Sequence, residues 1–321
     1  MTALHSLQQP DHARGAGSDA GPAAREVVDR ARETELLEAA LRSGAHVVLE
    51  GPPGTGKSTL LREVAARRDS SYVVVEGNAE LTPARLVGHF DPALVLERGY
   101  APEVFVDGPL LDALRSGGLL YVEELNRVPE ETLNTLLTVM SEHEIAVPRL
   151  GRVRAEPGFG IVAAMNPYDA VGTARVSSAI YDRTCRIAMG YQSADAEERI
   201  VGTRAPVPSP EWAACAVALV RSTRAHPEIR VGSSVRGVID LAGLAHELGR
   251  SRGVAGDDWH AGLDAALVAL SGRVRVDESS SRRPEEIIEE LYVAAFGPPP
   301  SSDADDSEPG ESGGGDPPGE A

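Results

Sequence analysis

The stretch Gly51-Pro52-Pro53-Gly54-Thr55-Gly56-Lys57-Ser58 decides the fold of this chain. It fits the pattern G-x-x-x-x-G-K-[ST] and stands between an apolar, β-rich run and an amphipathic helical pattern, the context of a phosphate-binding loop. The glycines let successive backbone N–H groups point at one anion, and the start of the next helix adds a favourable partial charge. We expect a nucleotide to bind here, on residues Gly51, Pro52, Pro53, Gly54, Thr55, Gly56, Lys57, Ser58 and Thr59.

Lys57 is the only lysine of the chain, which otherwise uses 30 arginines as its basic residues. A compact ammonium on a flexible stem fits between phosphates, where a planar guanidinium does not. The placement therefore favours neutralisation of the β and γ phosphates by Lys57, with Ser58 ligating Mg²⁺, over an incidental glycine-rich turn.

Five apolar runs predict the strands of one sheet, at 46–49, 72–75, 119–122, 160–165 and 185–189. Helical patterns between several of them indicate a parallel sheet, and continuous apolar runs are typical of strands covered by helices on both faces. Past Tyr191 the strand signal nearly vanishes, and amphipathic helices are expected at 195–204, 210–224, 234–248, 259–270 and 284–296. We predict an α/β domain over 25–191, opened by a helix at 25–45, and a helical domain over 192–296.

Composition limits the class of protein. The 321 residues are 42% apolar and 25% charged, as in globular proteins, with a net charge of −18 that would repel nucleic acid at long range. The segments 1–24 and 297–321 are expected to be unstructured tails, and the second holds seven carboxylates and no basic residue. No membrane span or secretory signal is visible, so the expected location is cytoplasmic.

The run Leu119-Leu120-Tyr121-Val122-Glu123-Glu124 predicts a buried strand that ends in two carboxylates. Such a pair can hold Mg²⁺ and polarise an attacking water. Successive side chains of a strand point to opposite faces, so the two carboxylates take separate roles unless the chain turns there. We expect Glu123 at the metal and Glu124 as the base; a solvated acidic strand end is the alternative.

The motifs together resemble the AAA+ ATPases, and among them the MoxR-type group, over about residues 25–296. Gly108-Pro109-Leu110-Leu111-Asp112-Ala113-Leu114 and Leu120-Tyr121-Val122-Glu123-Glu124-Leu125-Asn126-Arg127-Val128-Pro129 are similar to the family's "GPL…DEINRAP" segment. Glu123 replaces the usual aspartate, whereas Glu124 matches the family's catalytic glutamate. The resemblance implies an α/β fold: a P-loop AAA+ domain with a parallel five-stranded sheet, followed by a smaller all-helical lid domain.

Three further residues take their expected roles from this resemblance. Asn166, after the strand Gly160–Met165, resembles the sensor-1 residue that orients water, although Asn166-Pro167 also fits a simple turn. Arg183 resembles the finger that reaches a neighbouring subunit's nucleotide; Arg175, Arg186 or a surface ion pair are alternatives. Arg236, in Gly232-Ser233-Ser234-Val235-Arg236-Gly237, resembles the sensor-2 arginine of the lid, or it is an exposed residue of an ordinary capped helix.

The resemblance also implies an activity. A MoxR-type protein is expected to hydrolyse ATP with Mg²⁺ and to act as a homo-oligomeric, hexameric ring that remodels, matures or activates a protein client. That client could be a von Willebrand factor A domain protein, and the segment 144–154 resembles a hairpin that could contact it. A gas-vesicle-type assembly ATPase is one alternative; a nucleic-acid motor or loader is a second, disfavoured by the acidic charge.

Overall fold

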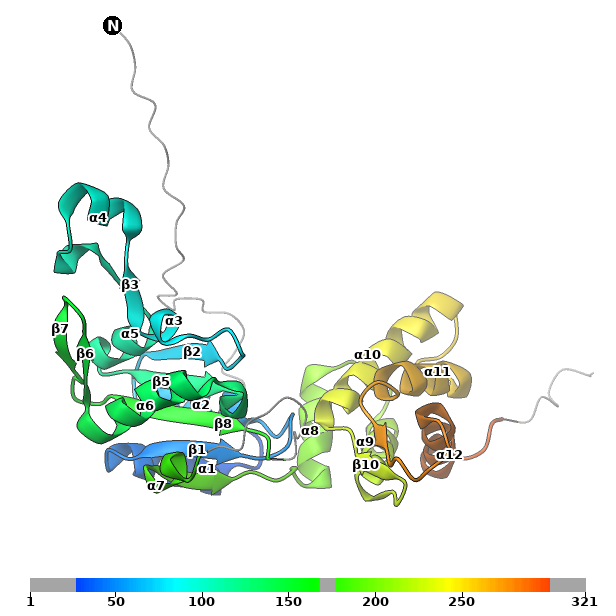
Figure 1. Cartoon of the computed structure of the whole chain (residues 1–321). Helices are drawn as coiled ribbons and strands as arrows, with labels where there is room; N and C mark the ends of the chain where they lie inside the picture. The colour runs from blue at the N-terminus through cyan, green and yellow to red at the C-terminus, as the bar shows by residue number, and fades with distance from the viewer. Residues whose placement is uncertain (1–26, 168–176, 301–321) are drawn as a thin grey trace, which may run out of the picture.

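The computed structural model describes residues 27–167 and 177–300. They form a sheet-containing lobe and a helical lobe, which lie side by side in Figure 1. The expected tail 1–24, residues 301–321 of the expected tail 297–321, and the alternative residue Arg175 lie outside the described residues. None of the described helices is long and apolar enough to cross a lipid bilayer.

The first lobe is built on a parallel five-stranded sheet with the order β2-β5-β8-β1-β9. The strands lie where the apolar runs predict them: β1 (His46–Glu50), β2 (Tyr72–Glu76), β5 (Leu119–Glu123), β8 (Gly160–Met165) and β9 (Thr184–Ala188). The central strands β1 and β8 are buried along their whole length, whereas most residues of the edge strands β2 and β9 are not. The parallel order brings the carboxyl ends of all five strands to one edge.

Side-chain alternation along the strands divides the core into two layers. Val48 and Ala163 face one side, where α5 (Pro109–Ser116) and α6 (Glu130–Glu142) cover the sheet. Val47 and Val162 face the other side, where α1 (Ala31–Arg42) and α2 (Lys57–Arg67) cover it. Helices on both faces explain the continuous apolar runs.

Helix α1 is shorter than the helix predicted over 25–45. It begins at Ala31, because Asp29 has a positive φ of 60° and interrupts the helical backbone just before it. The residues just before the helix are therefore not helical, and Val27, Val28 and Arg30 line a cavity at the carboxyl edge of the sheet.

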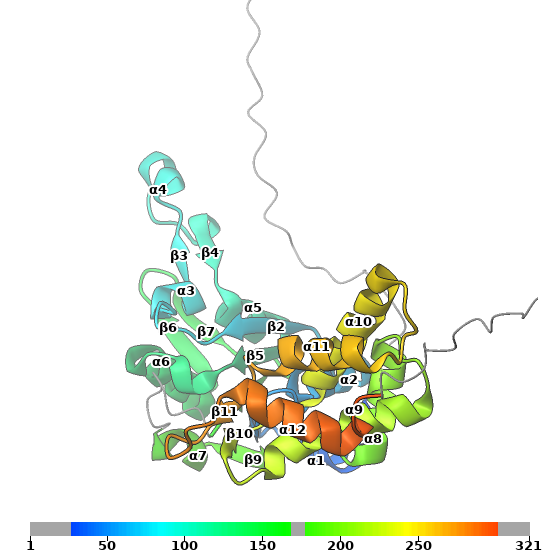
Figure 2. The same cartoon turned by 90° about the vertical axis from the view of Figure 1, so that its right-hand side faces the viewer.

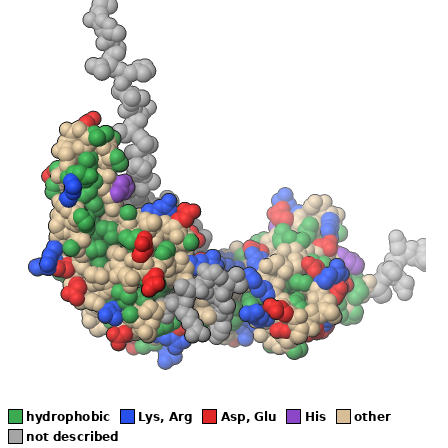
Figure 3. All heavy atoms as spheres, in the orientation of Figure 1, with side chains coloured by type: hydrophobic (Ala, Val, Ile, Leu, Met, Phe, Trp, Pro, Cys, Tyr) green, Lys and Arg blue, Asp and Glu red, His purple; other side chains and the backbone are tan. Residues whose placement is uncertain are grey.

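Between β2 and α5 the chain makes an excursion that the sequence patterns did not predict. It comprises α3 (Pro83–Val87), β3 (Gly88–Phe90), α4 (Pro92–Arg98), η1 (Pro102–Val104) and β4 (Phe105–Asp107). Its tip, α4, projects away from the sheet in both Figures 1 and 2. Leu96 of α4 is 90% exposed, and hydrophobic side chains gather over this projection in Figure 3.

The hairpin of β6 (Glu144–Val147) and β7 (Gly151–Arg154) forms within the segment 144–154 and approaches the projection. The Arg149 guanidinium in its turn lies 3.7 Å from the centre of the Tyr100 ring, a cation–π contact. This contact joins the two projecting segments.

The second lobe is a helical bundle with its own core. It contains α8 (Ala194–Arg204), α9 (Pro210–Ala225), α10 (Val235–Arg252), α11 (Trp259–Leu270) and α12 (Pro284–Phe296), each at a predicted position. Two short antiparallel strands, β10 (Ile229–Val231) and β11 (Arg275–Val276), add to the helices, so the lid is not helical throughout. The short α7 (Ser178–Asp182) precedes β9.

Candidate active site

The candidate phosphate-binding loop connects β1 to α2, at the carboxyl edge of the sheet. Gly54 and Gly56 have φ values of +77° and +89°, in the left-handed region that favours glycine. A Cβ atom at Gly54 would also lie 2.3 Å from the Ser234 hydroxyl of the helical lobe, so the loop needs glycine both for its curl and for its contact with that lobe.

Lys57 begins α2 and turns back over the loop. Its Nζ donates hydrogen bonds to the carbonyl oxygens of Gly51 at 2.8 Å and Pro52 at 2.9 Å. Burial, and to a smaller degree the positive charge of Arg236, lowers the pKa of Lys57 from 10.5 to about 8. The Glu123 carboxylate offsets part of this shift, and the ammonium lies where a further anion would be favourable.

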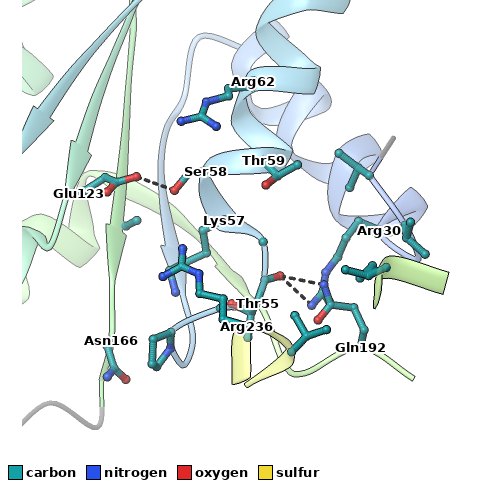
Figure 4. Close-up of a pocket in the computed structure, with 18 of the residues that line it drawn as sticks. Arg30, Thr55, Lys57, Ser58, Thr59, Arg62, Glu123, Asn166, Gln192 and Arg236 are labelled. Carbon is teal, nitrogen blue, oxygen red and sulfur yellow. Dashed lines mark hydrogen bonds between the residues drawn. The ribbon is translucent and has the colours of Figure 1, made fainter. Parts of the chain in front are cut away.

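Ser58 and Glu123 meet across the sheet edge, as Figure 4 shows. The Ser58 hydroxyl donates to Glu123 Oε1 at 2.5 Å, and the Tyr121 hydroxyl lies 3.2 Å from Ser58 Oγ. Burial raises the pKa of Tyr121, so this phenol stays protonated and can donate. A hydroxyl and a carboxylate beside a phosphate site suit Mg²⁺, which prefers oxygen ligands and usually keeps waters and substrate phosphates in its shell.

The chain turns at Glu124, directly after the strand that carries Glu123. The φ and ψ of Glu124 are both 48°, a left-handed conformation that turns the chain out of the strand just after Glu123. Both carboxylates consequently line the same cavity, rather than opposite faces of the sheet. The Glu124 Oε2 atom is 3.0 Å from Arg127 Nε, so this carboxylate is ion-paired at its outer side.

A single cavity of about 550 Å³ joins these residues to the helical lobe. Its lining includes Lys57, Ser58, Glu123 and Glu124, with Asn166 from the end of β8 and Arg236 from α10. In Figure 4 Arg236 extends from the helical lobe to the side of Lys57. Residues more than 170 positions apart in the sequence thus converge on one pocket that holds carboxylate, amide and cationic side chains.

Comparison with known proteins identifies the sheet-containing lobe. Residues 46–184 match the AAA domain (dynein-related subfamily). They form an AAA domain. An uncharacterized protein of Staphylococcus haemolyticus is 33% identical to the chain over 152 residues, which are 47% of the chain and 57% of that relative. One of Staphylococcus epidermidis is 27% identical over 217 residues, 66% of the chain and 82% of the relative.

A solved structure supports the same fold beyond the AAA domain itself. A mutant of RuvB from Thermotoga maritima superposes with a TM-score of 0.52 at 16% identity, covering 76% of the chain and 72% of RuvB. The expected fold class is confirmed: a P-loop AAA+ domain with a five-stranded parallel sheet, followed by a smaller helical lid.

Arg183 lies outside the pocket of its own AAA domain. It ends α7 and precedes β9, so it stands at the amino edge of the parallel sheet, whereas the phosphate loop follows the carboxyl end of the adjacent β1. The five-residue β9 separates the two edges by about 16 Å. Arg183 donates to Ser141 Oγ at 2.7 Å and to the Ala179 carbonyl at 3.1 Å, and the alternative Arg186 is paired with Glu50.

Arg30 and Gln192 line the pocket from outside the matched residues 46–184, and the sequence analysis did not identify them. Arg30, only 5% exposed, donates from Nη2 to the carbonyl oxygens of Thr55 at 3.0 Å and Gly190 at 2.5 Å. Gln192 donates to the same Thr55 carbonyl at 3.4 Å, as the dashed lines of Figure 4 show. These contacts fasten the outer side of the phosphate loop to the chain before α1 and to the connection between the lobes.

Proposed function

We propose that the chain is an ATP-hydrolysing AAA+ ATPase of the MoxR type, which acts as a ring-forming, chaperone-like motor on a protein client. The observation that carries the proposal is the convergence of the phosphate loop, Glu123, Glu124, Asn166 and Arg236 on one cavity. A fixed loop, paired acids and a lid cation in one pocket suit phosphoryl transfer to water, which depends on positioning and electrostatics. The cytoplasmic location expected from the sequence belongs to the proposal.

Each side chain has a task that its position supports. Lys57 would release the Gly51 and Pro52 carbonyls and bind the β and γ phosphates. Ser58 and Glu123 would hold Mg²⁺, directly or through water, and the ion would neutralise phosphate charge. Glu124 would leave Arg127 and polarise the attacking water, which Asn166 would orient.

The ring is proposed from the arginines. Arg236 lines the cavity from the lid of the same subunit, where it would contact the γ phosphate. Arg183 stands at the opposite sheet edge, so it would reach a nucleotide only in a neighbouring subunit. One arginine in cis and one in trans fit a hexameric ring in which hydrolysis moves each lid against the next subunit.

A protein client is favoured by the projecting segment 83–108. It exposes Leu96, Tyr100 and Val106, and its charged side chains are four carboxylates and two arginines. Apolar, slightly acidic surface suits a polypeptide and disfavours a phosphate backbone, so a nucleic-acid motor or loader is the weaker alternative. A von Willebrand factor A domain protein and a gas-vesicle shell protein stay open as clients of this proposal.

The test is ATP binding and hydrolysis by the full chain and two variants. Lys57→Ala should lose ATP binding in calorimetric titration, while Arg67→Ala, on the exposed end of the same helix, should match the wild type. Both variants should keep the wild-type melting temperature, because neither side chain belongs to the hydrophobic core. Equal ATP affinity in wild type and Lys57→Ala would overturn the proposal.

A further inference from the structure

Glu197 is a buried charge that the proposed chemistry does not use. It lies in the first turn of α8, the first helix of the lid, and is completely inaccessible to solvent. Two arginines of α9 approach it: Arg221 Nη1 is 3.1 Å from Oε2, and Arg224 Nη1 is 2.8 Å from Oε1. Removing a carboxylate from water costs several kcal/mol, which is compensated only by close pairing of this kind.

The same two arginines also hold backbone carbonyls at two places, one in the connection between the lobes and one in the turn before α10. Arg221 Nη1 donates to the Gln192 carbonyl at 3.0 Å, in the connection between the lobes, and Gln192 in turn touches the phosphate loop. Arg224 Nε donates to the Ser233 carbonyl at 2.7 Å, in the turn that precedes α10. The Arg224 guanidinium covers the Tyr191 ring at 3.9 Å, so this side chain spans from the connection to the turn.

The turn held by Arg224 leads directly into the start of α10, which carries Arg236. The Ser233 N–H donates to the buried Thr223 hydroxyl of α9 at 2.9 Å, so both backbone groups of Ser233 are fastened to α9. Ser234 fits against Gly54 of the phosphate loop, and Arg236 follows in the first turn of α10. A shift of this turn would displace Arg236 relative to the phosphates.

We propose that Glu197, with Arg221 and Arg224, is a positioning element that fixes the turn 232–234, and with it Arg236, relative to the connection between the lobes. The inference rests on the proposed function and extends it, since it names the residues that fix the position of Arg236. Because this element links α8 and α9 to the turn before α10, a rotation of α8 relative to the AAA domain would move Arg236 by the same rotation. Positioning acts on catalysis because a displacement of about 1 Å can cost 10²-fold in rate.

The informative variant is Arg224→Lys. A lysine keeps a positive charge beside Glu197 but lacks the fork that reaches Ser233 at the same time, so the turn is released without leaving a buried carboxylate unpaired. Arg252→Lys is the matched control, because Arg252 makes a 2.5 Å ion pair with Asp264 in the same lid, far along α10 from the pocket.

Two measurements decide the inference. Hydrogen exchange of the nucleotide-free protein should be faster at 230–239 in Arg224→Lys and unchanged in Arg252→Lys. The turnover number should fall at least about tenfold in Arg224→Lys, and this loss should disappear when Arg236→Ala is already present, because both changes remove one interaction. An unchanged exchange rate, or an equal turnover loss with and without Arg236, would overturn the inference. If the wild-type chain binds no ATP, the proposed function is refuted. The positioning element is then tested by the hydrogen-exchange rates alone.

Discussion

The lowered pKa of Lys57 makes nucleotide affinity depend on pH in a way that can be calculated. The phosphates bind the ammonium, and with a pKa of about 8 the free site is roughly 90% protonated at pH 7 and roughly 10% at pH 9. Apparent affinity scales with the binding-competent fraction, so the Kd for ATP should rise roughly tenfold between these two pH values. A lysine with the ordinary pKa of 10.5 would give almost no change over this range.

Calorimetric ATP titrations at half-unit steps from pH 6.5 to 9.5 provide the assay, with Lys57→Arg as the matched control. Arginine stays charged throughout, so whatever affinity Lys57→Arg retains should be flat with pH. A flat wild-type curve, or the same slope in both proteins, would refute the reasoning.

The same pKa shift makes the stability of the nucleotide-free protein change with pH in the direction opposite to ATP affinity. The folded-state pKa lies below the unfolded value, so the unfolded chain binds more protons between about pH 8 and 10.5. In that window the contribution of Lys57 to the free energy of unfolding should rise with pH, while ATP affinity falls. Denaturant unfolding of wild type and Lys57→Arg over the same pH range measures the difference.

Three further outcomes are expected. Glu124→Gln should keep ATP affinity and lose about 10²-fold or more in turnover, measured by phosphate release; if Glu123→Gln alone abolishes turnover, the two roles are reversed. Arg183→Ala should bind ATP yet hydrolyse it on the order of 10³-fold more slowly, and mixing it with Lys57→Ala subunits should restore activity; no rescue in rings shown to be mixed would exclude Arg183 as the trans residue. Leu120→Ala, in the completely buried core of β5, should cost about 2–5 kcal/mol in denaturant unfolding, and a smaller loss would mean that the cavity collapses.

The helices and strands that could be predicted are those whose capping residues and apolar pattern match the way they pack in the structure. Helix α11 begins at Trp259 as expected, because Asp258 caps it by accepting from the Ala261 N–H. The excursion 83–108 was missed because its pieces are too short to show a period, although Thr82-Pro83 and Asp91-Pro92 are both helix starts. Short elements of this kind depend on caps more than on patterning.

Site residues were predictable where they lie close in sequence to a recognisable motif, and unpredictable where their partners are distant in sequence. Tyr121 could have been foreseen, since it lies two residues before Glu123 and so shares its face of the strand. Arg30 could not, because its partners are backbone carbonyls 25 and 160 residues away. Glu197 looks in sequence like an ordinary acidic residue in the first turn of a surface helix.

The position of the only lysine gives the protein an unusual chemical vulnerability. Every acylating or alkylating reagent that selects lysine side chains must act at Lys57, and a pKa of about 8 leaves much more neutral, nucleophilic amine near neutral pH than an ordinary lysine offers. Lysine acetylation would therefore silence the nucleotide site outright rather than tune the surface charge. A bound triphosphate would shield the amine, so the extent of labelling would measure the fraction of nucleotide sites that are empty.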